Sequence, residues 1–194
     1  MNTDQFLRYF TLILLFFWAM LWKIKEKQAD KEKPKTKKPS ILGTVFNKSG
    51  FYFQSFLLTI ELLGFRLWPT PNYFYIQLVG LFLVFIGFYF SVAARLKLAA
   101  NWTQAYDYQI KKNHRLVTRG IYKYVRHPIY TGLVTIYTGA FLIAQSYFFI
   151  PALILLSLQY YFQGKKEEKL LASFFKKDYR KYLKTSKMFI PYLF

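Results

Sequence analysis

YFYIQLVGLFLVFIGFYFSVAA, residues 73–94, is an apolar run of 22 residues that contains no charged side chain. A helix needs about 20 such residues to cross the hydrocarbon core of a bilayer. The run therefore predicts a membrane-spanning helix. Four further apolar runs flank it, two on the N-terminal side and two on the C-terminal side, at residues 6–22, 51–68, 129–144 and 147–162.

The last two runs are separated only by Gln145 and Ser146. Such a short connection predicts a tight helical hairpin. Together the five runs predict an all-α integral membrane protein with about five transmembrane helices. No glycine-rich G-x-G-x-x-G fingerprint is present, so a Rossmann fold is not expected.

The composition agrees with a membrane protein. Hydrophobic residues make up 54% of the chain and aromatic residues 22%, yet the net charge is +19. These properties are compatible when apolar runs lie in lipid and charges lie in water. The chain has no cysteine and only two histidines, which excludes disulfides and Cys-ligated metals and argues against a His-rich metal site.

The basic residues predict the orientation in the membrane. Of the 28 Lys and Arg residues, 26 lie in segments 23–48, 95–126 and 165–194, whereas 69–72 and 145–146 have none. The positive-inside rule places the basic segments in the cytosol, which puts the N-terminus outside and the C-terminus inside. Because most aromatics lie inside apolar runs, we expect the lysines to contact anionic lipid headgroups rather than nucleic acid.

Glu61 is the one acidic residue inside the five runs, and it lies near Arg66 in the sequence. An intramembrane acid is a candidate functional group. Its position near the outer end of the run favours a structural role, in which it either snorkels to the interface or pairs locally, with Arg66 as the nearby partner.

The stretch HRLVTRGIYKYVRHPIYTG, residues 114–132, precedes the fourth run on the cytosolic side. Pro128 suits the first turn of a helix, where its missing N–H has no cost. His127 would then lie at the N-cap, with backbone N–H groups that attract an anion, and Arg126 adds a planar cation. A substrate-binding turn and a lipid headgroup anchor are equally good interpretations of this pattern alone.

The stretch GKKEEKLLASFFKKDYRKY, residues 164–182, follows the fifth run. Its apolar residues recur at helical spacing, which predicts an amphipathic helix. Glu167 and Glu168 form an acidic pair that either makes surface salt bridges with lysines or receives an ammonium group. In a hairpin these acids would face Arg126 and His127, an arrangement that fits the zwitterion of an amino acid.

Together these motifs resemble the isoprenylcysteine carboxyl methyltransferase family and, more widely, the phospholipid methyltransferase group of membrane enzymes. The shared elements, in order, are His114-Arg115-Leu116-Val117-Thr118, Gly120, Tyr122, Arg126-His127-Pro128-Ile129-Tyr130, Gly132, Glu167-Glu168, Phe174-Phe175, Tyr179, Tyr182 and Pro191. The match covers roughly the last 85 residues, and several independent elements keep their order and spacing.

The resemblance implies a methyltransferase that uses S-adenosyl-L-methionine and releases S-adenosyl-L-homocysteine, with a cytosolic cofactor pocket and no metal. It assigns ten residues to the cofactor: His114, Arg115, Leu116, Val117, Tyr122, His127, Pro128, Ile129, Tyr130 and Glu168. Glu168 would take the cofactor ammonium, and Arg126 and Glu167 are the expected catalytic residues. Residues 1–96, with the basic linker 23–48, and the catalytic region 97–194 form the expected division of the chain.

Three functions follow from these observations. The first is carboxyl O-methylation of a C-terminal isoprenylcysteine. The second is N-methylation of a phosphatidylethanolamine-type headgroup by the same scaffold. The third is a non-catalytic protein that only binds lipid. The family tends to carry an Arg just before the acidic pair, where this chain has Gln163-Gly164-Lys165-Lys166, so the choice between carboxylate and amine acceptor stays open.

Overall fold

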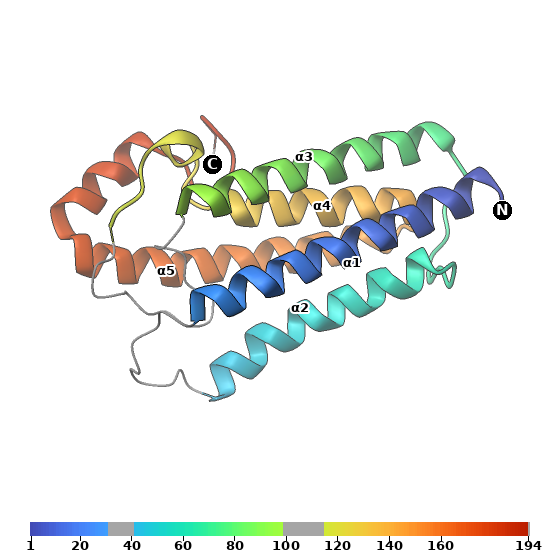
Figure 1. The fold of residues 1–194 in the computed structure, drawn as a ribbon, viewed down its shortest axis with the longest axis horizontal. Coiled ribbons are helices and arrows are strands. Elements are labelled where there is room, and N and C mark those ends of the chain that lie inside the picture. The colour runs from blue at the N-terminus through green and yellow to red at the C-terminus, as the bar shows by residue number, and fades with distance from the viewer. Residues whose placement is uncertain (31–40, 99–114, 194) are drawn as a thin grey trace.

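The computed structural model describes the backbone of residues 1–30, 41–98 and 115–193. Within these residues every regular element is helical, and the long helices lie side by side along one axis (Figure 1). The elements are α1 (Thr3–Asp30), α2 (Ile41–Leu62), α3 (Phe74–Leu98), the 3₁₀ helix η2 (Gly120–Lys123), α4 (Pro128–Ala144) and α5 (Phe149–Thr185). The all-α prediction is therefore confirmed for the described part of the chain.

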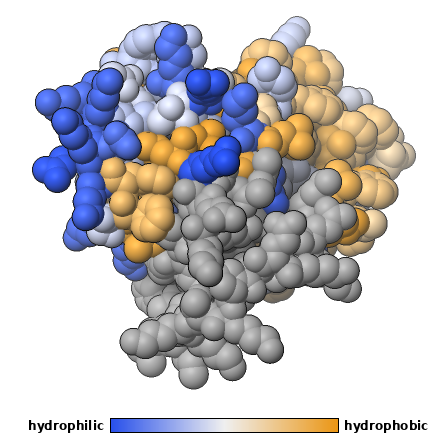
Figure 2. Space-filling model, turned by 60° about the vertical axis from the view of Figure 1, so that its left-hand side comes forward, coloured by the Kyte–Doolittle hydropathy of each residue, from blue (hydrophilic) through white to orange (hydrophobic). Residues whose placement is uncertain are grey.

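Two helical segments in the described part are long and apolar enough to cross a membrane, Thr3–Ile24 and Phe74–Leu98. Helix α4 is apolar but shorter. Many large apolar side chains of α1 and α3 are exposed, for example Phe16 and Phe82. In the space-filling view, hydrophobic side chains cover one side of the visible face and hydrophilic ones the other (Figure 2). This surface suits lipid around the bundle and water at one end.

Helix α2 differs from its predicted bounds. It ends at Leu62, whereas the apolar run continues to residue 68. Gly64 has φ of +107°, and the N–H of Phe65 donates to the carbonyl of Ile60, so the chain turns out of the helix there. Pro69 then excludes a new helix before α3. At its other end α2 begins within the expected linker.

Helices α3 and α4 pack through glycines that are spaced seven residues apart, Gly80 and Gly87 on α3 and Gly132 and Gly139 on α4. A methyl group on Gly139 would lie 2.3 Å from the carbonyl oxygen of Gly80. A methyl group on Gly132 would lie 2.7 Å from that of Gly87. Side-chain-free surfaces let two membrane helices approach closely, so these positions fix α4 against α3.

The predicted Glu61–Arg66 pair is wrong. Arg66 Nη2 lies 2.9 Å from Asp4 Oδ2 at the start of α1, and Arg8 Nη2 lies 3.0 Å from the same oxygen. Glu61 is fully buried and accepts instead from the N–H of Leu67, at 2.9 Å. The partner of Arg66 comes from a different helix, which sequence proximity alone does not reveal.

The hairpin of α4 and α5 is present as predicted. Gln145 ends α4 in the left-handed conformation, with φ of 55°, and its side chain donates to the carbonyl of Tyr73 at 2.9 Å. The predicted amphipathic helix is not a separate element, because α5 runs without a break through residues 164–175. A kink with φ of 45° at Lys176 then redirects the chain. The end of α5, η2 and the C-terminal segment gather at the cytosolic end predicted from the charges (Figure 1).

Candidate functional site

Helix α4 begins as the sequence predicts, with His127 at the N-cap and Pro128 in the first turn. The N–H of His127, expected to be open to an anion, instead donates to the carbonyl of Met188 at 3.1 Å. The N–H of Arg126 likewise donates to the backbone carbonyl of Lys187, at 2.8 Å. The C-terminal segment therefore lies alongside the start of α4 and holds it in place.

A buried ion pair joins the start of α4 to α5. Arg126 Nε donates to Glu168 Oε1 at 2.6 Å, and the two side chains are 11% and 10% exposed. Arg126 Nη1 also donates to the carbonyl of Ser186. Lys165 Nζ lies 3.8 Å from the other Glu168 oxygen at the solvent edge. The cationic turn and the acidic pair are thus brought together, as the hairpin argument predicted.

His127 lies between the two acidic side chains. Its Nδ1 is 3.5 Å from Glu167 Oε2, and its Nε2 is 3.5 Å from Glu168 Oε1. The ring is buried and stacks on Tyr130, with centroids 5.5 Å apart. Nε2 is buried, and its contact with Glu168 lies outside good hydrogen-bond geometry. The nitrogen therefore keeps capacity for a ligand group that binds beside the carboxylate.

Glu167 is held by neutral groups. The Tyr130 hydroxyl donates to Glu167 Oε1, and Gln163 Nε2 donates to the same oxygen at 3.3 Å. Tyr130 in turn stacks on Tyr160, with centroids 4.7 Å apart. These neutral contacts, together with His127 beside the other Glu167 oxygen, fix Tyr130 and Glu167 in one orientation.

The electrostatics of the cluster favour its ionised form. Burial raises the pKa of Glu168, but His127 and Arg126 lower it by more, so its pKa is about 2. Burial lowers the pKa of His127, but the carboxylates of Glu167 and Glu168 outweigh this effect and raise it overall. The pKa shifts of Glu168 and His127 therefore each favour the charged form of the group.

The raised pKa of His127 predicts a loss of stability with increasing pH. A histidine whose folded-state pKa lies above its unfolded value, about 6.5, stabilises the fold below that value, and the contribution disappears as pH rises through the folded pKa. Glu168 acts at the other extreme, because its contribution is present above its usual pKa of 4.5 and is lost as pH falls towards 2.

We therefore expect the free energy of unfolding in detergent to decrease as pH rises above about 6.5, by at most about 1.4 kcal/mol per pH unit for one proton. Thermal unfolding followed by circular dichroism measures it. His127→Gln should remove this part of the pH dependence, whereas His114→Gln should retain it. An unchanged slope in His127→Gln would contradict the assignment.

The other predicted site residues that the structure describes lie before η2, in η2 and in the first turn of α4. Tyr122, in η2, is buried, and its carbonyl accepts from the Tyr182 hydroxyl at 2.5 Å. Leu116 and Val117 are half-buried in the irregular segment before η2, and Arg115 is exposed. Pro128 is buried and Ile129 packs against the apolar core. His114 lies outside the described residues.

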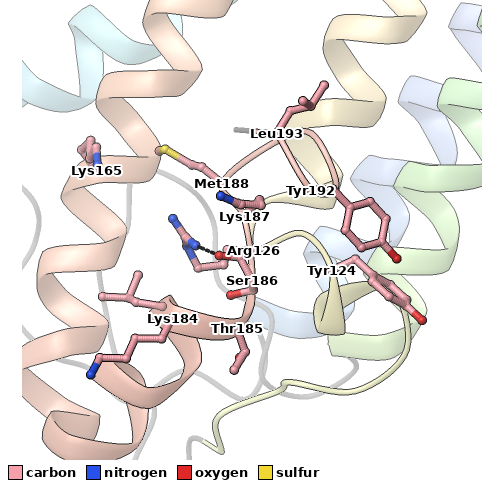
Figure 3. A pocket seen from close by; sticks show the side chains of 11 residues that line it. Tyr124, Arg126, Lys165, Lys184, Thr185, Ser186, Lys187, Met188, Tyr192 and Leu193 are labelled. Carbon is pink, nitrogen blue, oxygen red and sulfur yellow. Dashed lines mark hydrogen bonds between the residues drawn. The ribbon is translucent and has the colours of Figure 1, made fainter.

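A cavity of about 360 Å³ opens beside Arg126 (Figure 3). Its walls come from the end of α5 and the C-terminal segment, and the lining residues are Tyr124, Arg126, Lys165, Leu183, Lys184, Thr185, Ser186, Lys187, Met188, Tyr192 and Leu193. Arg126 is the only one of these that was predicted as a site residue. The cavity thus adjoins the cluster of Glu167, Glu168 and His127 without being lined by it.

Sequence reasoning missed the C-terminal segment as part of the site. The carbonyls of Ser186 and Met188 hold the start of α4 from about 60 residues away in the chain. It also missed Gly164, where a methyl group would lie 2.7 Å from Met188 Cε and 3.2 Å from His127 Nε2. A buried glycine inside a helix was the available signal, because glycine there costs about 1 kcal/mol relative to alanine and needs a packing reason.

The chain is similar to several known methyltransferases. It is 25% identical over 141 residues to the probable protein-S-isoprenylcysteine O-methyltransferases of Oryza sativa subsp. indica and japonica, covering 72% of this chain and 74% of the rice proteins. It is 30% identical over 109 residues to the protein-S-isoprenylcysteine O-methyltransferase of Schizosaccharomyces pombe, covering 55% of this chain and 45% of the yeast protein.

A solved structure shares the fold. The eukaryotic intramembrane Ras methyltransferase ICMT, isoprenylcysteine carboxyl methyltransferase, superposes with a TM-score of 0.54 at 22% identity. The alignment covers 78% of this chain and 52% of that protein, so the chain spans about half its length. The family model for phospholipid methyltransferases matches residues 75–178, more than half of the chain and most of the elements described above. The chain therefore belongs to the phospholipid methyltransferase family.

Proposed function

We propose that the protein is an S-adenosyl-L-methionine-dependent methyltransferase that methylates the C-terminal carboxylate of an isoprenylcysteine. The observation that carries the proposal is the buried pairing of Arg126 with Glu168, 2.6 Å apart, with His127 and Glu167 beside it. The names of the similar rice and yeast proteins support this acceptor over a headgroup amine.

The residues present fit the amino-acid end of the cofactor. Glu168 stays ionised because its pKa is about 2, so it is suited to hold an ammonium group. Arg126 and the Nε2 of His127, which has no close hydrogen bond, are suited to hold a carboxylate. In this proposal Tyr122, Leu116 and Val117, with Arg115 and His114, line the adenosine side, and Pro128, Ile129 and Tyr130 shape the turn. Among the described residues no cluster of three metal-ligating side chains occurs.

When bound, S-adenosyl-L-methionine supplies an electrophilic methyl group. A substrate carboxylate is already ionised at neutral pH, so no residue has to remove a proton from it. The chain's contribution is alignment and exclusion of water. Arg126 orients a carboxylate through its planar guanidinium. Glu167 accepts a hydrogen bond from the Tyr130 hydroxyl and lies 3.5 Å from His127 Nδ1, so it keeps both rings in place.

We propose that the chain crosses the membrane five times, with the N-terminus outside and the site in the cytosol. The distribution of lysine and arginine supports this orientation. The two helices that qualify as spans, α1 and α3, and the apolar α4 are compatible with it. In this arrangement a prenyl tail remains in lipid while its carboxylate reaches the start of α4.

Single cysteines test this topology, because the chain contains none. We expect a membrane-impermeant maleimide to label Pro71→Cys, in the connection between α2 and α3, from outside intact cells. Lys181→Cys, on the exposed side of the end of α5, should be labelled only after permeabilisation. Equal labelling of both positions in intact cells would contradict the orientation.

Two measurements test the proposed function. Calorimetry of the purified protein in detergent should detect binding of S-adenosylhomocysteine; no binding would favour a non-catalytic lipid-binding protein. Radiolabelled methyl transfer should then occur to a prenylcysteine analogue and not to phosphatidylethanolamine. Transfer to phosphatidylethanolamine alone would replace the carboxylate assignment by headgroup N-methylation.

A further inference from the structure

The cavity beside Arg126 has a one-sided charge. Four of its lining residues are cationic, Arg126, Lys165, Lys184 and Lys187, and none is acidic. In Figure 3, Arg126 and Lys187 both reach into the space between α5 and the C-terminal segment. Glu168 is paired with Arg126 at 2.6 Å and lies 3.8 Å from Lys165 Nζ, so its single carboxylate faces two of these cations. The site keeps a surplus of positive charge, which Lys184 and Lys187 extend along the cavity and which favours a bound anion.

The rim of the same cavity is apolar and exposed. Tyr192 and Leu193 line it and are 78% and 77% exposed, and Ile190 beside them is 49% exposed. Tyr124 also lines it, and its ring lies 6.0 Å from that of Tyr192. Exposed tyrosine and aliphatic side chains next to lysines are typical of a surface at the level of lipid headgroups. A small free anion would not contact these apolar side chains, whereas a lipid would.

We propose that this cavity binds the phosphate of an anionic phospholipid headgroup. The exposed Lys165, Lys184 and Lys187 provide the charge at the open side, with the largely buried Arg126 behind them. The acyl chains pass along Leu193 and Ile190. Basic pockets at the cytosolic ends of membrane helices bind anionic headgroups through this combination of lysines and interfacial residues. The cavity overlaps the proposed methyl-transfer site at Arg126 alone, and its other lining residues lie outside that site.

The test is titration of phosphatidic acid into the full-length protein in phosphatidylcholine-containing detergent micelles, followed by native mass spectrometry. We expect Lys184→Gln/Lys187→Gln to weaken phosphatidic acid binding about thirtyfold, or about 1 kcal/mol for each lysine. The control Lys177→Gln/Lys181→Gln removes the same charge from exposed positions of α5 outside the cavity, and should change binding by less than about threefold.

Two further arms separate the possible occupants. Inorganic phosphate should compete weakly with the lipid; equally tight binding of inorganic phosphate would overturn the lipid assignment. Binding of S-adenosylhomocysteine by Lys184→Gln/Lys187→Gln should match that of the parent. If this variant instead lost methyl transfer to a prenylcysteine in pure phosphatidylcholine, the cavity would be part of the substrate site and the proposal would be wrong. Equal loss of phosphatidic acid binding in both double variants would show that lysines attract the lipid nonspecifically, and would overturn the proposal of a site in this cavity.

Discussion

Glu168→Gln is expected to lower the affinity for S-adenosylhomocysteine at least about thirtyfold, because removing one partner of a buried charge pair costs about 2–5 kcal/mol. The substitution keeps the shape of the side chain and removes its negative charge. Arg126 then lies buried without its carboxylate, and a ligand ammonium loses its acceptor. Calorimetry in detergent measures the affinity, and methyl transfer to a prenylcysteine analogue should fall at least as far.

Three comparisons make this result specific. Asp178→Asn removes an acid from an exposed position of the same helix and should bind S-adenosylhomocysteine as the parent does. Glu168→Asp keeps the charge on a shorter side chain and should recover part of the affinity. Far-ultraviolet circular dichroism must show that Glu168→Gln retains its helices. A folded Glu168→Gln variant with parental affinity would refute the site.

The elements that sequence reasoning predicted correctly are those with local signals. Pro128 and His127 mark the start of α4 because proline has a defined place in the first turn of a helix. The short Gln145-Ser146 connection predicts antiparallel arms, which in turn bring Arg126 and Glu168 together. The family match confirms the methyltransferase resemblance that rested on these same residues.

The features that sequence reasoning missed depend on partners far away in the chain. Arg66 pairs with Asp4 from another helix rather than with nearby Glu61. The carbonyls of Ser186, Lys187 and Met188 hold the start of α4 through three contacts that leave no periodic pattern in the sequence. The early end of α2 follows from one glycine with positive φ, Gly64, which the sequence alone does not distinguish from the glycines Gly80 and Gly87 inside α3.

Gly139→Ala is expected to destabilise the protein by about 2–3 kcal/mol, the upper end of the cost of overpacking. The added methyl group would lie 2.3 Å from the carbonyl oxygen of Gly80 and 2.8 Å from the backbone nitrogen of Val84. Both atoms belong to the backbone of α3, so no side-chain rotation relieves the contact and the two helices must separate. The unfolding midpoint in detergent should fall accordingly.

Gly50→Ala is the matched control. Its methyl group would meet only the end of the Gln159 side chain, at 3.1 Å, and alanine gains up to about 1 kcal/mol over glycine within a helix. The same substitution should therefore be neutral or stabilising in α2 and harmful in α4. Arg126 and His127 lie at the start of α4. Its displacement should therefore also reduce the amount of S-adenosylhomocysteine bound, in proportion to the fraction of protein that has unfolded. Equal midpoints for the two variants would mean that α3 and α4 do not approach as closely as the glycine spacing requires, and the placement of the site on α4 would lose its support.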